Sequence, residues 1–97
     1  MPLSTKPLDL AEYLADPASQ AELLSDAVAT GDPAYLTHAL GIIARARGMS
    51  DTAEKAGVKR ETLYKALSLK GDPKLSTLLG VFKALGLKLT LEVIPDP

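Results

Sequence analysis

The sequence predicts one mainly α-helical domain that contains a helix-turn-helix and ends in a single β-strand. Three observations point to this fold class. Asp-Pro pairs stand where helices would begin, apolar residues recur at helical spacing as far as Leu85, and the spacing then changes to a strict alternation. A length of 97 residues with 46% hydrophobic residues suits one compact domain rather than a disordered chain.

The composition excludes several classes of protein. Zero cysteines exclude a disulfide scaffold and thiolate metal sites. No apolar run reaches about 18 residues, so no membrane span is expected, and the N-terminus lacks the basic and apolar regions of a secretory signal. We therefore expect a cytoplasmic protein. Aromatic residues contribute only 4% of the chain, which predicts a core built from Leu and Ala.

The first half of the chain is expected to form three helices. Asp9 and Glu12 have the spacing of a capping box, which favours a short helix there. The Asp-Pro pairs at 16–17 and 32–33 favour two longer helices, because Asp accepts hydrogen bonds from free backbone N–H groups and Pro has no N–H to leave unpaired. The expected ranges are about 9–15, 17–30 and 33–47, with stops at Gly31 and Gly48.

The second half is expected to form three further helices. Two short ones flank a break at Gly57 and Val58, and a third carries an apolar stripe that includes Leu78 and Phe82. Ser50 is expected to cap the first of them. The expected ranges are about 51–56, 60–69 and 75–85, with Gly86 ending the last.

The residues that follow have the period of a strand, as far as Pro95. One face of this strand would carry Leu87, Leu89, Leu91 and Val93, and the other Lys88, Thr90, Glu92 and Ile94. A lone strand needs hydrogen-bond partners for its backbone. The simplest source is the same strand of a second copy, paired antiparallel about a two-fold axis. The alternative is a disordered or extended tail.

Residues 49–68 contain the pattern of a helix-turn-helix. Two short helices that cross at a steep angle need a small residue at their contact, a glycine in the turn and apolar residues beyond it. Ala53, Gly57, Val58 and Leu63 meet these requirements in that order. The set as a whole is more specific than any one of its members.

The second of these helices is expected to enter the major groove of DNA. Arg60 can donate two hydrogen bonds to guanine, Glu61 can accept one from cytosine, and Lys59 and Lys65 can neutralise phosphates. The full set of expected DNA contacts is Ser50, Lys59, Arg60, Glu61, Tyr64, Lys65, Ser68 and Lys70, with Lys74 in the next loop. The alternative is an ordinary solvated helix face.

Nothing in the sequence indicates an enzyme or a metal site. His38 is the only histidine, and it stands on an expected helix without the carboxylate and hydroxyl pattern of a triad, so we expect a partly buried structural residue. One histidine and no cysteine give no metal-ligand spacing, and the scattered glycines form no phosphate-binding loop. We expect no cofactor.

The net charge of −1 conceals two regions of opposite charge. Residues 1–44 carry one base and six acids, whereas residues 45–97 carry ten bases and six acids. This asymmetry suggests two different partners, although the two regions could simply attract each other. The expected segments are an acidic helical extension at 1–32, a helix-turn-helix DNA-binding domain at 33–86 and a dimerisation strand at 87–97.

Nearly the whole chain resembles a known family. The stretches at 44–68 and 71–89, and an acidic leader that includes 11–14 and 31–33, are similar to the probable addiction-module antidote proteins. These are HigA-like antitoxins with a helix-turn-helix of the Cro/C1 type. The departures from the family pattern are Asp72 in place of Asn and Leu75 in place of Phe. In addition, residues 49–51 lack the Gln that many repressors place near the first helix to contact phosphate, and Lys59 replaces the more usual Ser or Gly.

The resemblance implies a lambda-repressor-like domain of five to six helices that acts as an antitoxin. Such a protein would neutralise a toxin resembling the mRNA-cleaving RelE/HigB type and, as a homodimer, repress its own operon by binding double-stranded operator DNA. The acidic leader would face the toxin, with apolar anchors at Leu10, Leu14, Leu23 and Leu24. Two alternatives stay open: a stand-alone repressor of the Cro/C1 type without a toxin, and a helical interaction module that no longer binds DNA.

Overall fold

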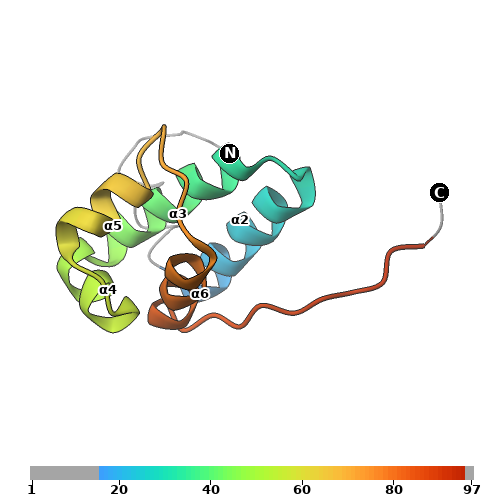
Figure 1. Cartoon of the computed structure of the whole chain (residues 1–97). Coiled ribbons are helices and arrows are strands. Elements are labelled where there is room, and N and C mark those ends of the chain that lie inside the picture. The colour runs from blue at the N-terminus through green and yellow to red at the C-terminus, as the bar shows by residue number, and fades with distance from the viewer. Residues whose placement is uncertain (1–15, 96–97) are drawn as a thin grey trace, which may run out of the picture.

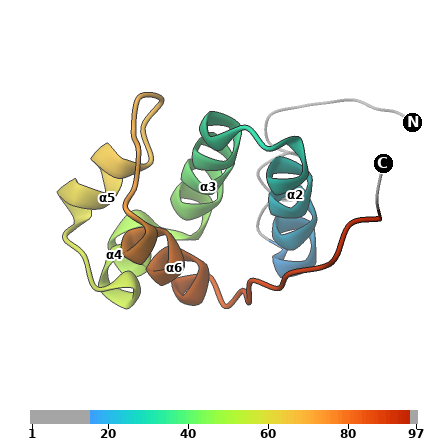
Figure 2. The ribbon, with the colours of Figure 1, turned by 45° about the vertical axis from the view of Figure 1, so that its right-hand side comes forward.

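The computed structural model describes residues 16–95, and this part of the chain forms five helices around one core (Figures 1 and 2). The helices are α2 (Pro17–Thr30), α3 (Pro33–Arg47), α4 (Met49–Ala56), α5 (Arg60–Ala66) and α6 (Leu75–Ala84). In both views α2 lies beside α3, and α6 crosses close to α4. The helix expected at 9–15 lies outside the described residues.

Both expected Asp-Pro helix starts are confirmed. The Asp16 carboxylate accepts a hydrogen bond from the backbone N–H of Ser19 (3.2 Å), and the Asp32 carboxylate accepts one from the N–H of Ala34 (3.0 Å). Gly31 ends α2 in the left-handed conformation (φ +72°), which glycine adopts without a steric penalty. These caps fix where α2 and α3 begin, and therefore which of their side chains face the core.

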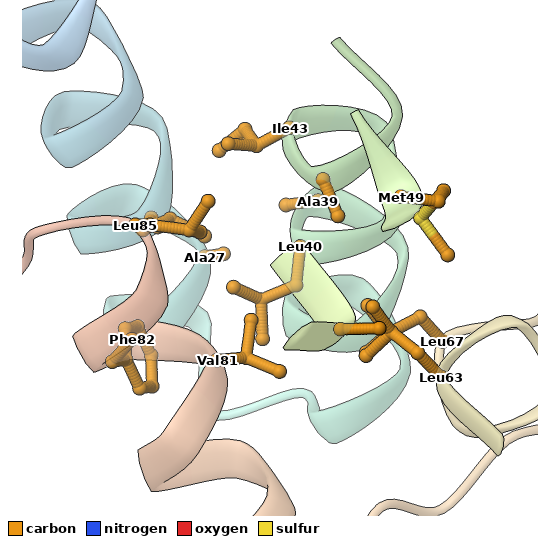
Figure 3. Packing of buried hydrophobic residues seen from close by; sticks show 13 residues of the cluster. Ala27, Ala39, Leu40, Ile43, Met49, Leu63, Leu67, Val81, Phe82 and Leu85 are labelled. Atoms are coloured by element: carbon orange, nitrogen blue, oxygen red, sulfur yellow. The ribbon is translucent and has the colours of Figure 1, made fainter. Parts of the chain in front are cut away.

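The core joins all five helices. Figure 3 shows Leu40 of α3, Leu63 of α5 and Val81 of α6 converging, and all three side chains are fully buried. The other buried apolar residues are Leu24, Ala27, Ala39, Ile43, Ala44, Met49, Ala53, Leu67, Phe82, Ala84 and Leu85. Leucine and alanine dominate the set, which confirms the prediction made from the low aromatic content.

The expected start of α4 is wrong by two residues. The helix begins at Met49 rather than Asp51, with Gly48 at the cap position and no side-chain cap. Met49 is buried (6% exposed), and its packing in the core extends the helix toward the N-terminus. Ser50 therefore lies inside the first turn and does not cap the helix.

The expected end of α5 is wrong by three residues. The helix ends at Ala66 rather than Leu69. The hydroxyl of Ser68 donates to the Lys65 carbonyl (2.8 Å), and its backbone N–H donates to the same oxygen (3.4 Å). A serine that bonds to the backbone in this way competes with continuation of the helix.

The expected C-terminal strand does not form within residues 16–95 of this single chain. Residues 87–95 instead run as an extended segment away from α6 and past α2 (Figures 1 and 2). The Leu87 N–H donates to the Phe82 carbonyl (2.9 Å), and residues 88–95 form no backbone hydrogen bond within the described part. A strand needs a second extended segment beside it, and one described copy supplies none.

Candidate nucleic-acid interface

The turn between α4 and α5 is fixed by Gly57. This glycine adopts the left-handed conformation (φ +77°), which is costly for a residue with a Cβ. Its N–H donates to the Glu54 carbonyl (3.2 Å), and the N–H of Val58 donates to the Ala53 carbonyl (3.0 Å). This pair of bonds is a Schellman motif, which ends α4 and redirects the chain into α5.

The inner side of the helix-turn-helix is apolar. Ala53 is 2% exposed and Leu63 is fully buried, while Val58 packs partly buried against the same core. A helix of seven residues is too short to be stable alone. The burial of Leu63 and Leu67 therefore holds α5 in place and determines which of its faces points outward.

Two glycines inside helices bring this motif close to the rest of the domain. A Cβ on Gly41 of α3 would lie 2.9 Å from the carbonyl oxygen of Leu67, just after α5. A Cβ on Gly80 of α6 would lie 2.8 Å from the carbonyl oxygen of Ala56, at the end of α4. Our sequence reasoning missed both, although a glycine within a helical pattern is a signal of close packing.

The outer side of α5 is exposed and mostly basic. With 3.6 residues per turn, Glu61 and Lys65 lie opposite the buried Leu63, and Arg60 and Tyr64 lie together on one flank. The structure places the expected DNA-contacting residues as follows: Ser50, Lys59, Arg60, Glu61, Tyr64, Lys65 and Lys70 are exposed, Ser68 is half-buried, and the neighbouring Lys74 is exposed. The outer side of the helix-turn-helix therefore presents polar side chains to solvent.

Arg60 and Tyr64 interact one turn apart on this face. The Arg60 Nη2 donates to the Tyr64 hydroxyl (3.4 Å), and the guanidinium carbon lies 5.3 Å from the centre of the aromatic ring. This distance is within the range of a cation–π contact. The hydrogen bond to Tyr64 raises the pKa of Arg60 above its ordinary value. The pair thus holds the guanidinium along the outer surface of α5.

The lysines of the motif differ in what they contact. Lys55 forms an ion pair with Asp51 in the same helix (3.1 Å), with both side chains exposed. Lys59, Lys65 and Lys70 form no ion pair with any residue of the described part. Their charges are therefore available to an external anion such as a phosphate.

The leucines expected to contact a toxin fall into two groups. The structure describes Leu23 and Leu24, whereas Leu10 and Leu14 lie outside the described residues. Leu24 is 4% exposed and packs in the core, and Leu23 is partly buried against it. The side chain of Leu24 is therefore used mainly to hold α2, and its expected contact with a toxin stays a prediction.

The residues expected to mediate dimerisation lie along the extended segment. Leu87 is partly buried against the core, whereas Leu89, Leu91 and Val93 are 49%, 94% and 97% exposed. Their exposure rises steadily with distance from α6. The segment thus carries large apolar side chains that this copy does not cover.

Few other residues of the described part are candidates for a functional site. His38 is exposed rather than partly buried as expected. Within residues 16–95, no three side chains among His, Asp and Glu come together in a way that could hold a metal ion. In the same range, no helix combines the length and apolar character that crossing a membrane requires.

The described residues thus form a small helical domain with a Schellman turn between two short helices and exposed basic side chains on the second. Residues 4–93 match the family described as probable addiction module antidote protein. The chain therefore belongs to this family, whose members act as antidotes to a cognate toxin and not as enzymes. An uncharacterized protein of Haemophilus influenzae is 40% identical over 87 residues, which cover 90% of each chain. No solved structure shows significant similarity to the chain.

Proposed function

We propose that this antidote neutralises a RelE/HigB-like toxin and, as a homodimer, represses its own operon by binding operator DNA in a sequence-specific manner. One observation carries the DNA-binding half of the proposal. The outer face of α5 is exposed and rich in unpaired cations, while the buried Leu63 on the opposite side fixes its orientation. A charged helix face that served only to interact with solvent would not need an orientation fixed by a buried residue on the opposite side of the helix.

In this proposal α5 enters the major groove with its N-terminal residues toward the base edges. Arg60 donates to guanine, Glu61 accepts from cytosine or orients Arg60, and Tyr64 contacts a thymine methyl or a phosphate. Lys59 and Lys65 neutralise phosphates on either side of the groove. Peripheral phosphate contacts come from Ser50, Ser68 and Lys70.

The toxin-binding half of the proposal rests on the acidic N-terminal region. Glu22 and Asp26 are exposed on α2, and a toxin that holds RNA must itself carry positive charge. Opposite charges accelerate association and favour the right partner, but apolar contacts supply most of the affinity. Leu10 and Leu14 are the proposed anchors, with Leu23 at the edge of the contact.

A gel-shift assay on the promoter of the chain's own operon tests DNA binding. Wild-type protein should retard the fragment at low salt and lose affinity steeply as salt rises. Arg60→Ala should cost about 1–3 kcal/mol, or roughly 5- to 150-fold in affinity, and relax specificity at one base position. Lys83→Ala, which removes an exposed cation from α6, should bind as wild type does. No retardation at low salt, or an unchanged affinity in Arg60→Ala, would refute DNA binding.

Co-expression with the product of the neighbouring gene tests the toxin. The antidote should co-purify with that protein and relieve its inhibition of growth. The double variant Leu10→Asp/Leu14→Asp should lose both effects yet still retard operator DNA. If wild type retards DNA and binds no neighbouring product, the chain is a stand-alone repressor of the Cro/C1 type.

A further inference from the structure

We propose that residues 87–93 of two copies pair as an antiparallel two-stranded ribbon centred on Thr90. In this arrangement Leu91 and Val93 of each copy enter a groove that lies between α2 and the C-terminal segment of the other and is also lined by Phe82 of α6. The inference rests on the homodimer of the proposed function and specifies its register and its contacts.

The backbone of residues 88–95 is extended and has hydrogen-bonding groups that a second strand could pair with. The Leu87 N–H is bonded to the Phe82 carbonyl, which anchors the segment to α6, and residues 88–95 form no backbone hydrogen bond within the described part. An extended backbone with unpaired N–H and C=O groups and exposed apolar side chains is a template for another strand. The most exposed apolar side chains of the segment are Leu91 and Val93, whose burial against a partner would be favourable.

The sequence of the segment selects one register. When an antiparallel pair is centred on Thr90, Lys88 of one copy lies opposite Glu92 of the other, twice by symmetry, and Leu89 lies opposite Leu91. Moving the centre to residue 91 would place Lys88 opposite Ile94, and moving it to residue 89 would place Lys88 opposite Thr90. Of these three registers, only the one centred on Thr90 matches both charged residues with opposite charges.

A groove on the domain fits the apolar face of this ribbon. Its apolar walls are Leu24 and Val28 of α2, Phe82 of α6, and Leu87 and Leu89 of the segment. The polar residues Ser25, Lys88, Thr90 and Glu92 also border it, and its volume is about 390 Å³. Val28 is 49% exposed, so the wall on α2 is not covered in this copy.

Residues that lie directly opposite each other in an antiparallel pair point to the same face. The second copy's Leu91 and Val93 would therefore stand on the face of Leu87 and Leu89, toward the groove. This contact covers the exposed apolar side chains of one copy with the uncovered wall of the other.

The symmetry of the charge pattern favours a second copy over the edge of a toxin sheet. Lys88 and Glu92 are equally spaced on either side of Thr90. That spacing brings opposite charges together when the segment meets itself in antiparallel orientation. For an unrelated strand the same spacing would have no particular value.

Disulfide trapping tests the register, and the absence of natural cysteines makes the result unambiguous. Thr90→Cys should form a covalent dimer on mild oxidation, because opposed residues in an antiparallel pair have the Cα separation that a disulfide needs. Glu92→Cys is the matched control on the same face, and it should not cross-link, because its opposite residue is Lys88. Equal cross-linking of the two variants would overturn the register.

Charge reversal tests the pairing in solution by sedimentation equilibrium. Lys88→Glu should raise the dissociation constant of the dimer about 10-fold, since it turns two attractive cross-strand pairs into repulsive ones. Lys88→Glu combined with Glu92→Lys should restore the wild-type value. Lys83→Glu, an equal charge change on α6, should leave the dimer unchanged. Failure of the double variant to recover would overturn the pairing.

The remaining outcomes separate this inference from the proposed function. A monomeric wild type that still neutralises the toxin and retards operator DNA overturns the ribbon alone. If Lys88→Glu weakens toxin capture and leaves the dimer unchanged, the ribbon is also overturned. Residues 87–93 would then contact the toxin instead of a second copy. A Thr90→Cys dimer that binds neither toxin nor DNA supports the ribbon and refutes the proposed function.

Discussion

The Arg47 guanidinium donates a 2.8 Å hydrogen bond to the side-chain oxygen of Gln20, which is completely buried. The same nitrogen donates a longer bond (3.4 Å) to the Leu85 carbonyl. One side chain at the end of α3 thereby links α2 to the C-terminal end of α6. A buried amide is costly unless its polar atoms are bonded, so Arg47 supports the packing of both neighbours.

Arg47→Ala should lower the free energy of unfolding by about 1.5–3 kcal/mol, because a hydrogen bond to a charged group is lost from a buried amide. Urea denaturation measures the change. Arg45→Ala is the control, since Arg45 is exposed on the same helix and its loss should stay within about 0.5 kcal/mol. Equal effects in the two variants would show that the contact with Gln20 adds nothing.

Gly80→Ala should destabilise the domain by about 1–3 kcal/mol. The sign is informative, because the same change at an unhindered helix position stabilises a protein by up to about 1 kcal/mol. Here the new methyl group would meet the Ala56 carbonyl oxygen and push α6 away from α4. Ser76→Ala, at an exposed position of α6, should be neutral or slightly stabilising. Thermal unfolding measures both, and a stabilised Gly80→Ala would contradict the close packing of these helices.

The two sides of α5 should respond differently to truncation. Leu63→Ala should cost about 2–5 kcal/mol of stability, since the side chain is fully buried. The neighbouring Tyr64→Ala should cost less than about 1 kcal/mol of stability and mainly weaken operator binding. Urea denaturation combined with gel shift separates the two effects. A large loss of stability in Tyr64→Ala would show that the outer face also belongs to the core.

Lys65→Gln should reduce the salt dependence of operator binding. Each phosphate contact contributes about 0.9 to the slope of log affinity against log salt concentration, so losing one lysine should lower the slope by about that amount. Lys83→Gln should leave the slope unchanged. Fluorescence anisotropy across a salt series measures it, and identical slopes for Lys65→Gln and wild type would mean that Lys65 contacts no phosphate.

Local chemistry made much of this fold predictable. The bounds of α2 and α3 followed from Asp16 and Asp32, because an N-cap acts within one turn of its own residue. The break at Gly57 was predictable for a similar reason, since only neighbouring residues decide whether a left-handed turn forms.

Tertiary contacts limited the prediction elsewhere. Gly41 and Gly80 matter because of carbonyl groups on other helices, and the role of Arg47 depends on Gln20, which lies 27 positions earlier. Leu24 shows the same limit. A stripe of leucines predicts a buried face, and sequence alone does not reveal whether a partner or the domain itself covers it.

The division of α5 between one buried leucine and an exposed outer face bears on how such modules diverge. Arg60 and Glu61 lie outside the core, so under the proposed function their replacement would alter base recognition at little cost in stability. Gly41 and Leu63 meanwhile hold α5 in the same orientation against the rest of the domain. Under the proposed function, a genome that carries several antidotes of this kind could keep their operators distinct by varying a few surface positions on one unchanged scaffold.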